Sequence, residues 1–277
     1  MSRGRGSGAG TGAIAVMIVA SVVATACTPG PVGVASLPPD ALANSLLAHW
    51  TFDEGGAMFS VPDSSGNEHN GLISGNNWRP VAEGKFGGAL HLGGSDAFGN
   101  GTSVSVGGFP QAMSAFTVSA WFRLDSVDVG PALSETMALM SNELLGGGGW
   151  AMNLELPLPV GNGDANYQFT YSTAPPSIDV RAQCLCLDQD VWTNIAAVVD
   201  AVPGRPGTLT MYVKGVAAMQ VDVTVPIGRG LQTLYIGRWP GAGRFLTGDL
   251  DDIAIWQRAL VPAEIRLLQT TSPPTPM

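Results

Sequence analysis

The sequence predicts an all-β protein in which two antiparallel sheets pack face to face, with one short helix near the C-terminal end. Only 13% of the residues are charged, whereas 37 are Gly and 20 are Pro. This composition favours many short strands joined by turns over long helices with surface ion pairs. Short apolar or alternating runs follow one another along the chain, and the one convincing helical run is Pro262 to Leu268. A closed barrel is the alternative arrangement of the same strands.

The amino terminus resembles a bacterial export signal. Arg3 and Arg5 precede an uncharged run from Ala13 to Ala26, which is too short for a membrane span of about 20 residues. Cys27 follows the run, and the segment resembles a lipoprotein signal, in which this Cys is lipidated after cleavage. Such signals usually have Leu where Ala24 stands, so ordinary cleavage next to Cys27 is the alternative. Either way the protein is expected to be exported, and lipidation would anchor it to a membrane.

The remaining chain is expected to hold one domain. Residues 28–45 are rich in Pro, Gly and Ala and are predicted to be a tether. Residues 46–269 are predicted to form the folded body. Residues 270–277 are predicted to be a disordered tail, because their prolines cannot continue a helix or a central strand.

Strands are predicted wherever a short apolar or alternating run is bounded by turn residues. After Val213, Lys214 and Gly215 are expected to form a hairpin turn in which Gly215 takes a positive φ. The predicted strands are Leu46–Phe52, Gly71–Ile73, Lys85–Leu92, Phe116–Leu124, Ala138–Ser141, Trp150–Leu154, Tyr167–Tyr171, Trp192–Val199, Leu209–Val213, Gln220–Val225, Leu234–Gly237 and the run ending at Trp256.

The run Phe116–Leu124 has the clearest two-residue alternation. One face is apolar, whereas the other carries Thr117, Ser119, Trp121 and Arg123 and is expected to face outward. In the last strand, the same period places Asp251 on one face with Ile253 and Ile255. A carboxylate in a buried strand is costly, so it needs a cation or hydrogen-bond donors as partners.

Several fragments together resemble the concanavalin A-like (laminin G-like, pentraxin-related) jelly-roll domains. The resemblance covers residues 46–268 and implies a β-sandwich, often a structural calcium ion, and usually carbohydrate or protein binding. Relatives often have Asp or Asn where Lys214 stands. The fragments are Trp50-x-Phe52-Asp53-Glu54, Asp63-x-Ser65-Gly66-Asn67, Phe86-Gly87-Gly88-Ala89-Leu90, Phe116-Thr117-Val118-Ser119-Ala120-Trp121, Trp192-x-x-Ile195-Ala196, Met211-Tyr212-Val213-x-Gly215 and Gly248-x-Leu250-Asp251-Asp252 with Arg258-Ala259-Leu260.

The resemblance implies a calcium site that joins the loop from Asp63 to Asn67 with Asp251, helped by Asp53 or Asp252. Carboxylate, amide and main-chain oxygens are the ligands that Ca²⁺ prefers. Two alternatives remain open. The loop also fits tight Asx-type turns, and Asp251 could accept hydrogen bonds from turn amides near Gly66 without any ion.

Chemistry by the protein itself is not expected. Glycoside hydrolysis needs two suitably spaced carboxylates, and hydrolases of this fold place two glutamates on one strand. The run from Asp249 to Asp252 contains no Glu. We therefore expect a non-catalytic binding module. A glycan-cleaving hydrolase or lyase is the alternative.

Three tryptophans are candidates for stacking on a sugar ring. Trp78 and Trp239 are expected on loops, and Trp121 on the polar face of its strand. Cys184 and Cys186 lie two positions apart, so in a strand both would face one side. In an oxidising compartment they could form a strained disulfide or pair with a partner molecule.

The net charge of −9 argues against a nucleic-acid partner, because neutralising phosphates requires clustered Lys and Arg. The sequence thus predicts an exported, lipid-anchored β-sandwich that binds carbohydrate or an extracellular protein. A purely structural surface module is a further alternative.

Overall fold

The structure is a computed structural model. It describes residues 37–275 except 39, 55–58, 96–99, 126–135, 145–147, 156–164, 173–178, 188–189, 224–226 and 241–243. The side chains of residues 165–166, 172 and 179–187 are not described either. The expected export signal, Cys27 and most of the expected tether therefore lie outside the described residues.

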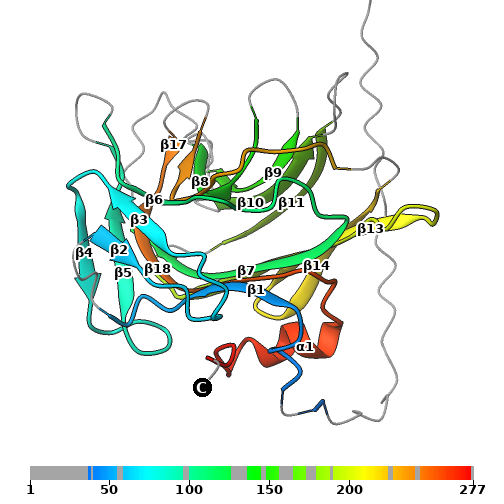
Figure 1. The fold of residues 1–277 in the computed structure, drawn as a ribbon, viewed down its shortest axis with the longest axis horizontal. Helices are drawn as coiled ribbons and strands as arrows, with labels where there is room; N and C mark the ends of the chain where they lie inside the picture. The colour runs from blue at the N-terminus through cyan, green and yellow to red at the C-terminus, as the bar shows by residue number, and fades with distance from the viewer. Residues whose placement is uncertain are drawn as a thin grey trace, which may run out of the picture. The chain divides into compact units, whose positions relative to one another are not determined.

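The described chain forms two antiparallel sheets packed face to face, which confirms the predicted sandwich (Figure 1). We call them the first sheet and the second sheet. The first sheet contains, in spatial order, β14 (Val216–Val223), β13 (Gly207–Val213), β12 (Thr193–Asp200), β7 (Ala115–Leu124), β18 (Thr247–Trp256), β5 (Ala89–Gly93) and β4 (Trp78–Val81), with β1 (Leu46–Trp50) paired to β18.

The second sheet lies opposite, and a separate two-stranded ribbon adjoins it. The ribbon consists of β16 (Arg238–Trp239) and β17 (Arg244–Phe245), and both strands lie against β8. The second sheet contains, in spatial order, β11 (Asp179–Leu187), β10 (Ala165–Ser172), β9 (Gly149–Glu155), β8 (Thr136–Ser141), β15 (Leu234–Ile236), β6 (Ser103–Val106), β3 (Gly71–Ser74) and β2 (Ser60–Val61).

The main hydrophobic core fills the space between the two sheets. As predicted, the apolar face of β7 points into it, and every apolar residue from Phe116 to Leu124 on that face is fully buried. The ring of Phe116 meets Trp150 of β9 and Phe169 of β10, with ring centroids 5.7 and 6.3 Å apart. Aromatic contacts therefore join the two layers at this point.

A second hydrophobic cluster covers the outer face of the first sheet. The helix α1 (Pro262–Leu267) and the segment before β1 pack there against Trp256. Trp256 is fully buried, and its indole Nε1 donates to the main-chain oxygen of Leu42 at 2.7 Å. The folded body therefore begins before residue 46, and the end of the predicted tether belongs to it.

The last strand contains an irregularity that the two-residue period did not predict. Asp252 has a φ of 48°, and the register between β18 and β7 shifts between Asp251 and Ala254. Leu250, Ile253 and Ile255 consequently share the main core, whereas Asp251 points away from it. The prediction that Asp251 lies on the same face as Ile253 is wrong, because a β-bulge adds one residue between them.

The turn between β13 and β14 confirms the predicted hairpin. Lys214 and Gly215 have φ values of 49° and 77°, as a type I′ turn requires. The sequence did not predict β2, β4, β6, β11, β16 and β17. The C-terminal segment is also more ordered than predicted, because Ser272 contacts Asp252 and Pro273 is buried.

Candidate functional site

A polar groove lies on the outer face of the second sheet, the face opposite the core. Alternate residues of β9 and β10 project there, because their neighbours Leu154, Phe169 and Tyr171 point into the core. Asn153 pairs with Gln168 of β10 across the strands. Glu155 pairs in the same way with Thr136 of β8. Adjacent strands thus bring these polar residues together as a floor.

The floor is buried although it faces away from the core. Asn153, Gln168 and Thr170 are only 5%, 3% and 6% exposed. The amide oxygen Oδ1 of Asn153 has no hydrogen-bond partner among the described residues. An unpaired buried acceptor costs about 1–3 kcal/mol, so this oxygen favours a ligand or water molecule that can donate to it.

The two-stranded ribbon forms a wall of the groove. Trp239 of β16 donates from its indole Nε1 to Oε2 of Glu143, at 2.7 Å. The guanidinium carbon of Arg244, on β17, lies 5.0 Å from the centre of the Trp239 ring. This cation–π contact and the indole hydrogen bond fix the orientation of the wall relative to β8.

The groove encloses about 290 Å³. This volume lies near the lower end of the range for small-ligand sites, roughly 300–1,000 Å³. It is lined by Thr136, Glu143, Asn153, Glu155, Gln168, Thr170, Trp239 and Arg244.

Of the three tryptophans predicted to bind a ligand, only Trp239 lies at this groove. Trp78 begins β4, which is an edge strand of the first sheet. Its ring meets Phe59 edge-on, with centroids 5.8 Å apart. Trp121 is 5% exposed, and its Nε1 donates to the main-chain oxygen of Leu268. The prediction of an exposed Trp121 is wrong, because the segment after α1 covers that face. Trp78 and Trp239 lie on strands and not on loops.

The predicted calcium ligands do not gather at one point. Asp63 accepts hydrogen bonds from the main-chain nitrogens of His49, Ser65 and His69, all at 2.9 Å. Asn67 donates to the main-chain oxygens of Leu46 and Leu47. The loop therefore uses its side chains as the Asx-type turn does, tying itself to β1.

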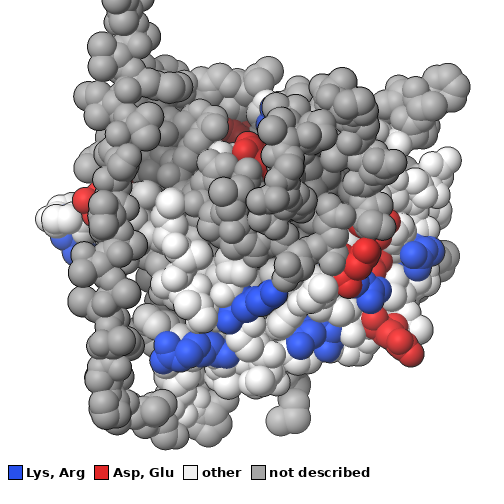
Figure 2. Space-filling view, turned by 180° about the vertical axis from the view of Figure 1, so that it is seen from behind, with Lys and Arg blue, Asp and Glu red and all other residues white. Residues whose placement is uncertain are grey.

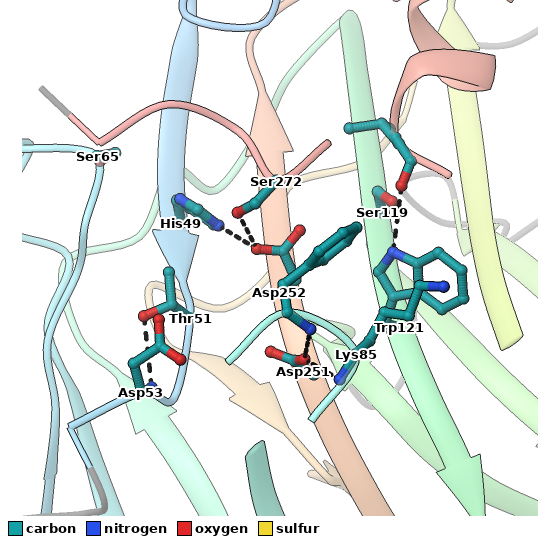
Figure 3. Close-up of polar contacts among 12 residues, drawn as sticks. His49, Thr51, Asp53, Ser65, Lys85, Ser119, Trp121, Asp251, Asp252 and Ser272 are labelled. Atoms are coloured by element: carbon teal, nitrogen blue, oxygen red, sulfur yellow. Dashed lines mark hydrogen bonds and ion pairs between the residues drawn. The ribbon is translucent and has the colours of Figure 1, made fainter. Parts of the chain in front are cut away.

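Asp251 contacts a different loop from the one predicted. Its Oδ2 accepts hydrogen bonds from the main-chain nitrogens of Lys85 and Phe86, at 2.6 and 2.8 Å (Figure 3). Two glycines allow this approach. A Cβ atom on Gly84 would collide with Asp251, and one on Gly87 would collide with Asp53. The glycines of the 84–88 turn thus let both carboxylates reach its backbone.

The other oxygen of Asp251, Oδ1, is buried without a partner among the described residues. Burial is the largest cause that raises the pKa of Asp251 to about 7, from an ordinary value of 3.8. The charges of Asp252 and Asp53 raise this pKa further, and the two backbone hydrogen bonds lower it. An uncompensated negative charge here favours either a proton or a cation.

Asp252, although next in sequence, has different partners. Its Oδ1 lies 2.8 Å from Nε2 of the fully buried His49, and accepts a hydrogen bond from Ser272 (Figure 3). Asp53 accepts a hydrogen bond from the main-chain nitrogen of Gly88, at 2.6 Å. Within the described part of the chain, no three His, Cys, Asp or Glu side chains come together as a metal site.

The two Cys predicted to pair lie on one strand, β11. Cys184 is opposite Tyr167 of β10 in the register. The side chains of Cys184 and Cys186 are outside the described residues, so their pairing stays a prediction. Cys27 is outside them as well.

Sequence reasoning missed the carboxylates and amides of the groove. Asn153 and Glu155, and likewise Gln168 and Thr170, alternate with core residues along their strands, and this signal could have identified the floor. Glu143 follows β8 and carries no such pattern, because its role depends on Trp239, 96 positions further along the chain.

The surface behind the view of Figure 1 carries both signs of charge. Figure 2 shows Lys and Arg side chains across the lower part of this face and Asp and Glu side chains near one end of them. No helix in the described residues is long and apolar enough to cross a membrane.

The fold defines a class, the concanavalin A-like β-sandwiches. Residues 98–266 match the concanavalin A-like lectin/glucanases superfamily, and the chain belongs to it. The family resemblance predicted from the sequence is thereby confirmed. No curated protein matches the sequence.

Solved structures share the fold at low identity. The binding domain of Paraclostridial Mosquitocidal Protein 1 is 17% identical with a TM-score of 0.61, over 82% of this chain and 52% of that one. The binding domain of Botulinum neurotoxin DC, in complex with rat synaptotagmin II, is 14% identical with a TM-score of 0.60, over 82% and 52%. This chain thus spans about half the length of these domains.

A third structure is matched over nearly its whole length. Domain 4 of AbnA, a GH43 extracellular arabinanase from Geobacillus stearothermophilus, in complex with arabinotriose, is 19% identical with a TM-score of 0.54. The match covers 82% of this chain and 98% of that domain. At these identities the likeness shows the fold alone.

Proposed function

We propose that the protein binds a carbohydrate in the groove on the outer face of the second sheet and performs no chemistry on it. The observation that carries this proposal is the buried amide and hydroxyl floor, in which Asn153 Oδ1 has no partner among the described residues. Sugar hydroxyls both donate and accept hydrogen bonds, so they can satisfy such a floor. The arabinotriose complex of AbnA domain 4 supports this kind of ligand, and the synaptotagmin complex supports a protein as the alternative.

A glycan array probed with the full chain tests the proposal. Gln168→Leu removes the hydrogen-bonding amide from the floor and keeps a side chain of similar size. Binding should fall at least roughly tenfold, because a buried hydrogen bond to the ligand is lost. Thr208→Val, on the first sheet, is the control and should bind normally. Equal binding by wild type and Gln168→Leu would exclude this groove.

A second candidate function is glycan cleavage, and one observation favours it. Glu143 and Glu155 both line the groove, so the pair of carboxylates that the run Asp249–Asp252 does not supply is present elsewhere. An assay for reducing ends decides between the two functions. Release of reducing ends by wild type, lost in Glu155→Gln, would replace binding by hydrolysis or elimination.

We also propose a calcium site, but with fewer protein ligands than the sequence predicts. The five predicted ligands do not fit a single site, since Asp63, Asn67 and Asp252 are bonded elsewhere. Only Asp251 and Asp53, which meet the 84–88 turn together, fit one, with the unpartnered Oδ1 of Asp251 as the supporting observation. Main-chain oxygens would have to complete the shell. EDTA should then lower the melting temperature of wild type but not of Asp251→Asn. If wild type melts at the same temperature with and without EDTA, the calcium proposal is wrong.

Export and lipid anchoring are proposed from the sequence. The basic and apolar composition of residues 1–27 supports both, and Cys27 is the residue to be lipidated. Cys27→Ala should move the protein from the membrane fraction to the soluble fraction. Unchanged partitioning would reject the anchor without affecting the groove.

A further inference from the structure

We infer that the groove selects a positively charged amino sugar, whose protonated amino group pairs with Glu155 while a neighbouring hydroxyl donates to Asn153. This inference rests on the proposed carbohydrate function of the same groove. It narrows the ligand from any sugar to one with a cationic substituent.

The charges that line the groove favour a cation. Among the described residues that line the groove, two carboxylates, Glu143 and Glu155, accompany one cation, Arg244. Arg244 stacks over Trp239, and the indole of Trp239 donates to Glu143, so these three side chains belong to one wall. Glu155 lies on the floor, and its carboxylate has no hydrogen bond or ion pair with any described residue. Because no described residue pairs with this carboxylate, a ligand cation fits it as a partner.

A second observation independently points to a donor-bearing ligand. Asn153 lies two residues before Glu155 on β9, on the same face, and its unpartnered Oδ1 is buried. Two residues of strand span about 7 Å. The floor therefore presents two acceptors that have no partner among the described residues, about 7 Å apart along the strand, and a ligand with two donors fits them.

The remaining lining favours a sugar over a basic peptide. Hydroxyl and amide side chains, Thr136, Gln168 and Thr170, surround the two acceptors and can bond to ring hydroxyls. Among the described residues of the lining, Trp239 is the one aromatic side chain. The net charge of −9 adds long-range attraction for cations and disfavours acidic polysaccharides.

Isothermal titration of the full chain with two matched probes tests the inference. The probes are a glucosamine oligosaccharide and its fully N-acetylated form of equal length, in a mildly acidic buffer that keeps the amino groups protonated. Acetylation removes the charge and leaves the ring unchanged. The amino form should bind roughly tenfold to hundredfold more tightly, as expected for one charge-assisted hydrogen bond.

Two variants locate the effect. Glu155→Gln should abolish the preference for the amino form and keep the weaker binding of the acetylated form. Glu83→Gln removes the same charge from an exposed site near the first sheet and should keep the preference. If Glu83→Gln abolishes it equally, net charge alone explains the effect and the inference fails.

The outcomes separate this inference from the proposed function. Equal affinity for both probes would overturn the cationic preference and leave carbohydrate binding intact. Absence of binding to either probe overturns the inference, and the glycan array then decides the wider function. If oligolysine binds as tightly as the amino sugar and loses its binding in Glu155→Gln, the ligand is a basic peptide and the sugar is excluded.

Discussion

The two sheets share one core but differ in what covers their outer faces. On the first sheet, α1 and the segment before β1 cover the face, and Trp256 is buried beneath them. On the second sheet, the face carries Asn153 and Gln168 as the floor of a groove. On the first sheet, apolar side chains of the chain itself pack against the outer face and bury it. On the second sheet, a buried acceptor has no partner among the described residues, and the proposed binding site rests on this difference.

The largest expected effect is on the covered face. Trp256→Ala should lower the free energy of unfolding by about 3–5 kcal/mol, because it leaves a cavity under α1 and removes the bond to Leu42. Urea denaturation measures this change. Trp78→Ala, a matched truncation of a half-buried Trp on β4, should cost clearly less. Equal losses would contradict the idea that the second cluster is a core of its own.

Asp251 should make stability depend on pH. Its pKa is about 7 in the folded state and near 3.8 when unfolded, so the folded state binds the extra proton between these values. In EDTA, the stabilisation is complete below about pH 4 and is lost by about pH 7, a change of about 2–4 kcal/mol. Asp251→Asn should remove this component. Parallel pH profiles for the two proteins would show that folding does not raise the pKa of Asp251.

Arg258 fixes the covering segments to each other. It forms two hydrogen bonds to Glu264, at 2.7 and 2.8 Å, and others to the main-chain oxygens of Ala41 and Asn44. Lys cannot reproduce this fork, so Arg258→Lys should cost about 1–3 kcal/mol in thermal or urea unfolding. The exposed Arg79→Lys is the control. If both substitutions are neutral, hydrophobic burial alone holds the cover in place.

The smallest effect is expected in the groove. Glu155→Gln should change the free energy of unfolding by less than about 0.5 kcal/mol, because its carboxylate has no described partner to lose. Urea denaturation of the variant beside wild type measures this. A loss comparable to that of Arg258→Lys would mean that Glu155 supports the fold, and would weaken the distinction between the two faces.

Much of the framework was predictable from alternation along single strands. The apolar face of β7, the hairpin at Lys214 and Gly215, and the helix at Pro262 were all predicted. The candidate site was predictable only in part. Trp239 was identified, and the alternation in β9 and β10 contained the floor residues, although it was not used for them.

The incorrect predictions share one physical cause, which is contact between distant segments. The bulge at Asp252 turned Asp251 toward the 84–88 turn, and the segment after α1 covered Trp121. Neither contact follows from local spacing, because each depends on a segment far away in the chain. The expected pairing of Asp251 with the loop at Asp63 failed for the same reason.

By itself, the sequence determined most of the longer strands, most of their core-facing residues and the sandwich, because the two-residue period dictates which apolar side chains of a strand are buried together. Only the tertiary structure decided which outer face is covered and which is hollowed. The two-residue period predicts that a side chain points away from the core, but it does not predict which segment covers that side chain. Trp121 and Gln168 both point outward, and only their neighbours make one a buried support and the other part of a groove.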